Sequence, residues 1–365
     1  MKKIIKIFDY FFIGFSYLAS KKIVAILVVL LFVSLLKTSF AYHEEQDVNQ
    51  KQLITVENET IYEKENADIN YYNEEVDKVD YGSGSAILDY ITCYQEGINM
   101  EEVPKNVSDQ INKLKALFDE NEQHYSFYYQ ELFSGFTVSY NEDAPIFTAS
   151  SIKAPAMIYL YEKASKGEID LNESLVYTGQ FYSEGSGVLK SKEINTTYTI
   201  RELIYYAIHY SDNIAYAMLM NRFSRTDMLS FWNNLGTKHI FTRNTIWGIT
   251  SAKDASIYMK ELYRFSKENE EYGTVLLDYF KGSDWKMVTD KEGKLNTASK
   301  GGWAGVAFHD AAIVYDENPY ILIIMSNTGE SNYSYLFKNA SQIVGTLHEE
   351  YWKYKVDTCR NISQY

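Results

Sequence analysis

The sequence predicts an α+β domain with three layers, α/β/α, in which one antiparallel sheet is covered by helices. Three observations predict this class. Two strand-like segments follow a helical segment early in the domain, three more lie late in the chain, and a long helical segment comes last. The stretch between the two groups of strands has helical patterns, so helices from both ends of the domain can cover one sheet.

The first helix of the domain is predicted by apolar residues at helical spacing. Ile111, Leu114 and Leu117 share one face, and Ser108 is a suitable N-cap, which gives a helix over 109–121. The other elements are expected as a helix over 86–100, strands over 125–131 and 135–140, a helix that carries Ser150 and Lys153, helices over 200–209 and 214–223, strands over 296–301, 305–315 and 320–326, and a helix over 333–354.

Caps and turns define further boundaries. Thr199 is the expected cap of the helix over 200–209, and either Ser211 or Asp212 can cap the next helix. The turn residues 316–319 join the last two strands as a hairpin, which makes that pair antiparallel.

Charge and composition exclude one class of function. The 365-residue chain has a net charge of −14 and 46% hydrophobic residues, enough to bury a large core. A nucleic-acid-binding protein needs a basic surface to contact phosphates, so we expect no nucleic-acid partner. Residues 42–82 carry twelve acidic residues and three lysines, and residues 42–104 are predicted to form an acidic, flexible stalk.

The first 41 residues predict export. Five lysines precede an apolar run over 23–36 that is interrupted only by Ser34. The run is short for a membrane-spanning helix and typical of a signal-peptide core, and Ser39 and Ala41 are small residues at the positions that a signal peptidase reads. The sequence leaves open whether residues 1–41 are a signal peptide or an N-terminal membrane anchor. In both cases the bulk of the chain is extracytoplasmic, membrane-anchored or secreted, because the lysines precede the run and acids follow it.

A folded domain is expected over 105–357, followed by a tail over 358–365. Cys93 and Cys359 flank this domain, and in an exported chain they are either a disulfide or two thiols, which the sequence leaves open. The six histidines are scattered without the paired spacing of metal ligands, so we expect neither a metal nor another cofactor. The protein is expected to be a monomer.

Three short motifs carry the chemistry, in the order Ser150-Ser151-Ile152-Lys153, Ser211-Asp212-Asn213, Lys300-Gly301-Gly302. A serine three residues before a lysine shares a helix face with it, so the lysine can accept the proton of a nucleophilic serine. A lysine acts as a base only when its pKa is lowered, which burial or a nearby cation such as Lys300 achieves. Together the motifs predict acyl transfer.

Each motif alone is weak. Ser-x-x-Lys is expected about once by chance in a chain of this length, Lys-Gly-Gly is typical of a turn, and only Ser-Asp-Asn is rare. The prediction therefore depends on the ordered set, with each motif on the element that its chemistry needs.

The motifs and their neighbours resemble the class A β-lactamase-like and penicillin-binding-protein-like serine hydrolase family, from about residue 109 to residue 354. The resemblance implies the β-lactamase/transpeptidase-like fold, with an antiparallel sheet packed with helices plus a helical subdomain. It also implies a covalent acyl-serine intermediate. The segments that carry it are 148–155, 185–189, 199–203 with 211–213, and 300–303.

The same resemblance implies catalytic roles for five residues. Ser150 is the nucleophile and Lys153 its proton acceptor. Ser211 relays a proton to the leaving nitrogen, and Asn213 holds Lys153 and the substrate amide. Lys300 attracts the substrate carboxylate.

The implied oxyanion hole consists of the backbone N–H groups of Ser150 and Trp303, beside the substrate-binding Gly301 and Gly302. The family usually has Thr or Ser where Gly301 stands, and that hydroxyl binds the substrate carboxylate. Losing one charge-assisted hydrogen bond of this kind costs about 1.5–3 kcal/mol of carboxylate recognition.

A second departure concerns deacylation. Class A β-lactamases carry a glutamate between the second and third motifs that activates the deacylating water. Here no Asp or Glu lies between Asp227 and Asp254. Glu184 is the candidate for a carboxylate that reaches the site from elsewhere.

The expected function is an exported serine acyl hydrolase that acts through an acyl-serine on β-lactams or cell-wall peptide amides, with slow deacylation. Two alternatives stay open: a D,D-peptidase-like enzyme, and a catalytically weak sensor or scaffold domain that binds β-lactam or peptidoglycan. The expected partners are a small β-lactam or a peptidoglycan stem peptide, and the membrane through the N-terminal segment.

Overall fold

The computed structural model describes residues 103–119, 125–241, 246–305, 307–316, 318–326 and 333–362, all within the unit Tyr81–Tyr365. The expected N-terminal segment, the stalk up to residue 102 and the helix over 86–100 lie outside these residues, as do Cys93 and the side chain of Cys359. No helix in the described ranges is long and apolar enough to cross a membrane.

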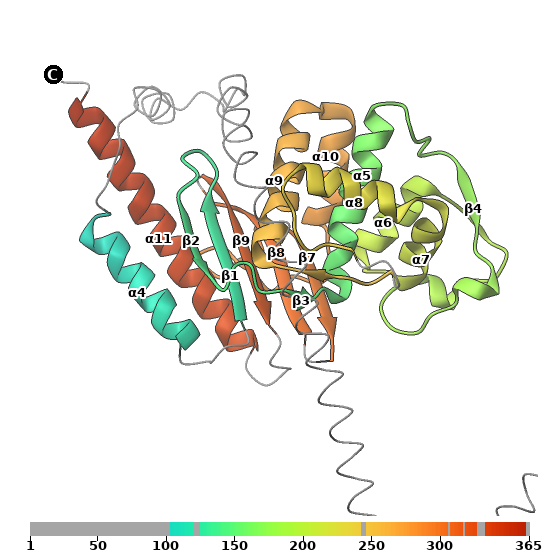
Figure 1. Ribbon diagram of the computed structural model, residues 1–365, viewed down its shortest axis with the longest axis horizontal. Coiled ribbons are helices and arrows are strands. Elements are labelled where there is room, and N and C mark those ends of the chain that lie inside the picture. Colours follow the sequence, from blue (N-terminus) through green and yellow to red (C-terminus); the bar gives the residue numbers. More distant parts are fainter. Residues whose placement is uncertain are drawn as a thin grey trace, which may run out of the picture. The chain divides into compact units, whose positions relative to one another are not determined.

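A five-stranded antiparallel sheet forms the middle layer (Figure 1). Its order, β2-β1-β9-β8-β7, places the first two strands beside the last three, so segments far apart in the sequence pair with each other. Strand β7, which carries the third motif, lies at one edge. The strands are β1 (Tyr125–Glu131), β2 (Thr137–Tyr140), β7 (Thr297–Ala304), β8 (Ala307–Tyr315) and β9 (Pro319–Ser326).

Alternation along the strands separates two hydrophobic layers. On β9, Leu322 packs into one cluster of buried side chains and Ile323 into the other, as a period of two requires. The first cluster joins the sheet to α4 (Lys105–Asp119) and α11 (Tyr333–Ile362), and the second joins it to α9 (Ala252–Glu268). Helices therefore cover both faces of the sheet (Figure 1).

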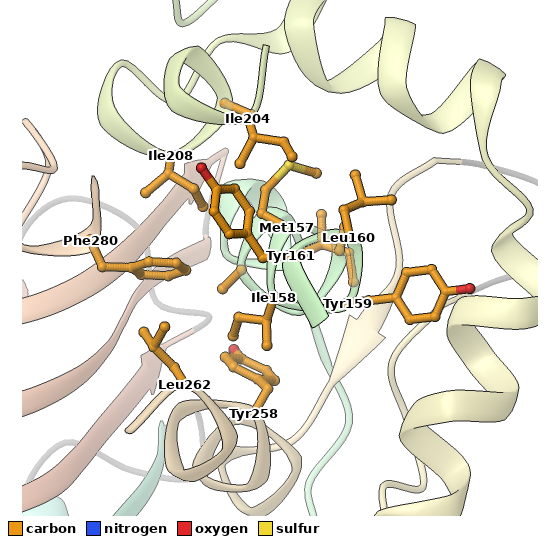
Figure 2. Close-up of a cluster of buried hydrophobic side chains, with 14 of the residues drawn as sticks. Met157, Ile158, Tyr159, Leu160, Tyr161, Ile204, Ile208, Tyr258, Leu262 and Phe280 are labelled. Atoms are coloured by element: carbon orange, nitrogen blue, oxygen red, sulfur yellow. The ribbon is translucent and has the colours of Figure 1, made fainter. Parts of the chain in front are cut away.

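Helix α5 is the centre of the helical part. Every residue from Lys153 to Glu162 is buried, and Figure 2 shows Ile158 and Tyr161 among side chains of α6, α9 and α10. Burying one large apolar side chain contributes about 1.5–3 kcal/mol, so this packing holds α5 firmly in place. The helices of this part are α5 (Lys153–Ser165), α6 (Ile200–His209), α7 (Asn213–Arg222), α8 (Arg225–Asn234) and α10 (Glu270–Lys281).

Short elements connect these parts in the described ranges. Two small antiparallel sheets pair β3 with β6 and β4 with β5. The bounds are β3 (Ile146–Phe147), β4 (Ser174–Val176), β5 (Thr197–Thr199) and β6 (Ile249–Thr250), and the 3-10 turns are η1 (Ala149–Ile152), η2 (Gly179–Phe181) and η3 (Leu189–Ser191).

The predicted three-layer α+β fold is confirmed, but the predicted Ser108 cap is wrong. Helix α4 begins at Lys105, because the Pro104 carbonyl already accepts the N–H groups of Val107 and Ser108. A proline has its φ preset for a helical first turn, which favours this earlier start. The Ser108 hydroxyl donates instead to the Lys105 carbonyl.

Two other boundaries differ from the predictions. The strand expected from residue 135 begins at Thr137, because Gly135 has a φ of 70° and closes a turn onto the Glu131 carbonyl. The last helix continues to Ile362, so the first residues of the expected tail are helical.

Candidate active site

Ser150 lies on a 3-10 turn and not in the α-helix predicted to carry it. The turn η1 runs directly into α5, whose first residue is Lys153. The reason is Ala149, whose φ of 45° belongs to the left-handed region that a right-handed helix does not contain. A non-glycine residue at positive φ stores strain, and such strain gathers at functional sites.

The two adjacent serines have different surroundings. Ser151 is buried, and its hydroxyl donates to the Thr148 carbonyl at 2.7 Å. Ser150 is half-buried, and its Oγ lies 3.2 Å from the Nζ of Lys153. Of these two hydroxyls, the structure therefore brings Ser150 to the lysine.

Lys153 connects the three motifs. Its side chain is fully buried, and its Nζ donates to Asn213 Oδ1 at 2.8 Å and to the Ser211 carbonyl. The same Nζ lies 3.3 Å from Ser211 Oγ. Lys300 donates to that hydroxyl at 3.0 Å, so Ser211 Oγ lies between the two lysines.

Burial changes the acidity of both lysines. Burial first, and the charge of Lys300 second, lower the pKa of Lys153 far below its ordinary value, while Asp212 opposes the shift. Burial lowers the pKa of Lys300 to about 7, against the opposing charge of Asp310. A lowered pKa favours the free amine, which is the form of Lys153 that can accept a proton from a neighbouring hydroxyl.

Asp212 organises the second motif. Its Oδ1 accepts two N–H groups from the first turn of α7, and its Oδ2 accepts those of Val188 and Leu189. Asp212 is therefore the cap of α7, and the alternative of a Ser211 cap is wrong. Ser211 has a φ of 53°, so it departs from the helix and its hydroxyl contacts the lysines instead.

The glycines of residues 185–189 let this loop pass closely over the second motif. Gly187 has a φ of 114°, and a Cβ there would overlap the Asp212 carboxylate. A Cβ on Gly185 would lie 2.8 Å from the side-chain nitrogen of Asn213. Glycine at both positions is thus a requirement of the close approach.

Strand β7 reaches the nucleophile at Gly302. A Cβ there would lie 2.7 Å from the Thr148 carbonyl oxygen, 2.8 Å from Ser151 N and 3.2 Å from Ser150 N. Only glycine allows this approach. Trp303, the second residue of the predicted oxyanion hole, follows Gly302 directly in the chain.

His309 on β8 supports the same approach, and the sequence did not reveal it. It pairs with Gly302, donates from Nε2 to the Phe147 carbonyl at 2.7 Å, and accepts the Ser326 N–H on Nδ1. Burial lowers the pKa of His309 to about 4, so the ring is neutral and can do both. Only the strand register shows this role, since no local pattern distinguishes this histidine.

Aromatic rings border another side of Lys153. Its Nζ lies 5.5 Å from the ring centroid of Trp247 and 5.9 Å from that of Tyr216. Tyr216 donates its hydroxyl to the Ile246 carbonyl at 2.7 Å. Residues 228–253 contain no Asp or Glu, so this segment brings the ring of Trp247 and no carboxylate to the lysine.

Glu184 is connected to the site through its main chain. Its carbonyl accepts the side-chain N–H of Asn213 at 3.2 Å. Its exposed carboxylate accepts the Tyr182 hydroxyl at 2.6 Å. The described residues contain no group of three or more His, Cys, Asp or Glu that could hold a metal ion.

Comparisons with known proteins agree with this geometry. The chain matches the Beta-lactamase enzyme family over residues 107–350, which is most of its length. It belongs to that family. No curated protein matches the chain.

Solved structures of this family share the fold. A point mutant of PBP-A, as an acyl-enzyme complex with penicillin G, aligns with a TM-score of 0.61 at 20% identity, over 67% of this chain and 97% of that chain. PBP-A aligns with a TM-score of 0.60 at 20% identity, over 69% of this chain and 99% of that chain. A β-lactamase from Sphaerobacter thermophilus aligns with a TM-score of 0.56 at 17% identity, over 68% of this chain and 97% of that chain. The predicted β-lactamase/transpeptidase-like fold is thereby confirmed.

Proposed function

We propose that this protein is an exported serine acyl hydrolase that forms a covalent acyl-Ser150 intermediate with β-lactams or cell-wall peptide amides and releases it slowly. The observation that carries the proposal is the 3.2 Å contact between Ser150 Oγ and the Nζ of buried Lys153, whose pKa is lowered. A neutral amine beside a half-buried hydroxyl is the pair that nucleophilic acyl transfer requires.

In the acylation step, neutral Lys153 takes the proton of Ser150 as Oγ attacks the substrate carbonyl carbon. The backbone N–H groups of Ser150 and Trp303 stabilise the charge that develops on the carbonyl oxygen. Protonated Lys153 then returns a proton through the Ser211 hydroxyl to the leaving nitrogen, whose bond to the acyl carbon breaks. Ser211 suits this relay because its Oγ lies 3.3 Å from Lys153 and 3.0 Å from Lys300.

Asn213 and Lys300 support this step from two directions. Asn213 Oδ1 accepts the Lys153 amine at 2.8 Å, which holds the amine between Ser150 and Ser211. The charge of Lys300 lowers the pKa of Lys153 and so increases the fraction of free base.

Slow release is supported by what surrounds the lysine. Hydrolysis of an acyl-serine needs a base that activates water, and residues 228–253 supply no carboxylate. The ring centroids of Trp247 and Tyr216 lie 5.5 and 5.9 Å from the Lys153 amine. Loss of one positioned general base typically slows a reaction about 10²–10⁴-fold, so Lys153 or Ser211 would activate water only inefficiently.

Relatives support the substrate class. The mutant PBP-A structure is an acyl-enzyme with penicillin G, and other similar structures are β-lactamases. The apolar run over 23–36 with its preceding lysines supports export, which would place the domain where cell-wall peptides occur.

An intact-mass time course tests the proposal. The protein is incubated with penicillin G and, separately, with a peptide that ends in D-Ala-D-Ala. One penicillin adduct is expected, persisting for minutes or longer, and Ser150→Ala is expected to form none. Steady release of D-Ala would favour the D,D-peptidase alternative, and an adduct that never turns over would favour a sensor or scaffold. Absence of any adduct and of any product would overturn the proposal.

A further inference from the structure

An aromatic stack occupies one face of strand β7. Side chains alternate along a strand, so Gly301 and Trp303 share a face. Trp303 is 49% exposed, and its ring centroid lies 5.4 Å from that of Trp285, with 27° between the rings. Phe308, buried on β8, stacks with Trp303 at 5.8 Å. We call Trp285 and Trp303 the indole platform.

The segment that carries Trp285 is fastened to the sheet. Asp310, fully buried and paired with Gly301 across the strands, accepts the N–H groups of Met287 and Val288 at 2.6 and 2.8 Å. The platform is therefore preformed, and a ligand does not have to order it.

The same segment crowds the side chain that the family usually has at position 301. A Cβ on Gly301 would lie 3.0 Å from the Trp285 carbonyl oxygen and 3.4 Å from that of His309. A Ser or Thr side chain is crowded there, and the neighbouring backbone would have to shift by a few tenths of an ångström to admit it. Carbonyl oxygens in place of a hydroxyl donor repel a carboxylate instead of binding it.

Lys300 compensates for this only in part. Its Nζ already donates to Ser211 Oγ at 3.0 Å and to the Gly301 carbonyl at 2.8 Å. Burial lowers the pKa of Lys300 to about 7, which weakens its positive charge near neutral pH. Among the described residues, this part of the site therefore combines two indole rings with a lysine that already donates to two protein oxygens.

We infer that the indole platform is a substrate subsite that accepts an uncharged, flat aromatic group where the family resemblance places a carboxylate. The subsite lies beside the reacting carbonyl because Trp303 also contributes its backbone N–H to the proposed oxyanion hole. The inference rests on the proposed acylation of Ser150 and adds a substrate preference. Aromatic contacts of this kind correspond to about threefold to tenfold in rate or affinity.

Three matched β-lactams test the preference: penicillin G as the free carboxylate, its methyl ester and its benzyl ester. Intact-mass measurements give the second-order rate of acylation of Ser150 by each compound. Each rate is divided by the rate of alkaline hydrolysis of the same compound, which removes differences in intrinsic reactivity. The benzyl ester is expected to react at least about threefold faster than the methyl ester, and the carboxylate slowest.

Variants identify the platform as the cause. Trp303→Ala removes the ring but keeps the backbone N–H, and it is expected to bring the benzyl-to-methyl ratio close to one. Trp303→Phe is expected to restore most of the preference. Tyr335→Ala is the matched control, since this tyrosine on α11 is 63% exposed and lies outside β7, and its ratio is expected to equal that of the wild type. Both rates come from one preparation, so partial misfolding does not change the ratio.

Each failure has its own signature. Equal rates for the two esters in the wild type, fastest reaction of the free carboxylate, or a preference that survives Trp303→Ala would overturn the inference and leave the acylation of Ser150 standing. No adduct with any of the three compounds would overturn the proposed function, and the subsite with it.

Discussion

The two sides of Lys153 differ in chemistry. On one side its amine contacts the hydroxyls of Ser150 and Ser211 and the amide oxygen of Asn213. On the aromatic side, its Nζ lies 5.5 Å from the ring centroid of Trp247 and 5.9 Å from that of Tyr216. The polar side supplies the nucleophile, the base and the proton relay of the proposed acyl capture. Residues 228–253, which bring Trp247 to the aromatic side, contain no carboxylate that would speed release. Capture and release can therefore be separated by mutation.

The largest effect is expected on the polar side. Ser150→Ala should abolish labelling of the protein by a fluorescent penicillin or a fluorophosphonate, because it removes the only nucleophile of the proposal. Ser151→Ala is the matched control and should still label. Its buried hydroxyl bonds to Thr148, so its loss should cost only about 0.5–1.5 kcal/mol of stability. Labelling that persists in Ser150→Ala and disappears in Ser151→Ala would show that the wrong serine has been chosen.

The second largest effect concerns the base. Lys153→Ala should slow acylation about 10²-fold or more, the usual contribution of one acid–base group, as measured by the rate of adduct formation. In the wild type the rate should rise with pH through the lowered pKa of Lys153, since only the free amine accepts the proton. Lys153→Met, which keeps the buried volume, controls for packing. A loss below about tenfold would reassign the base, most simply to a water held by Asn213.

The aromatic side offers the third test. Trp247→Glu should place a carboxylate near Lys153 and shorten the lifetime of the penicillin adduct about tenfold or more. Trp247→Gln introduces a side chain of the same shape as glutamate but without a base. If both variants release the adduct equally fast, water access, and not base catalysis, limits release. Rapid wild-type hydrolysis of nitrocefin, at tens of turnovers per second, would contradict slow release, and Glu184→Gln would then show whether that carboxylate has rescued it.

The smallest effect is expected for Lys300 and tests its electrostatic role. In Lys300→Ala the cation that lowers the pKa of Lys153 is absent, so protonated Lys153 becomes more stable and its pKa rises. The pH profile of fluorophosphonate labelling should shift to higher pH. The gap between the profiles should shrink above about pH 7, where Lys300 itself loses its charge. Lys294→Ala, at an exposed position, should leave the profile unchanged, and a shift of Lys300→Ala to lower pH would contradict the electrostatic argument.

Much of the fold follows from local sequence patterns. Alternating and helical periodicities predicted the strands of the sheet and the helices α4, α6, α7 and α11, because side-chain direction repeats with the secondary structure. The middle of the chain was expected to be helical, but α8, α9 and α10 were not predicted individually. Thr199 is the cap of α6 as predicted, and Glu202 completes a capping box with it. The start of α4 was wrong because Pro104, outside the periodic pattern, begins the helix earlier.

The sequence by itself determined which chemical groups are present: the serine and lysine of the first motif, the glycines of the third, and the lack of acidic residues over 228–253. Tertiary structure alone decided what those groups do. The lowered pKa of Lys153 depends on complete burial of its side chain. The three-residue spacing between Ser150 and Lys153 does not reveal that burial. In the sequence, the glycine at 301 indicates only a lost hydroxyl, whereas the fold places the Trp285 carbonyl against it. Electrostatics and packing depend on neighbours in space, and those neighbours come from segments far apart in the chain.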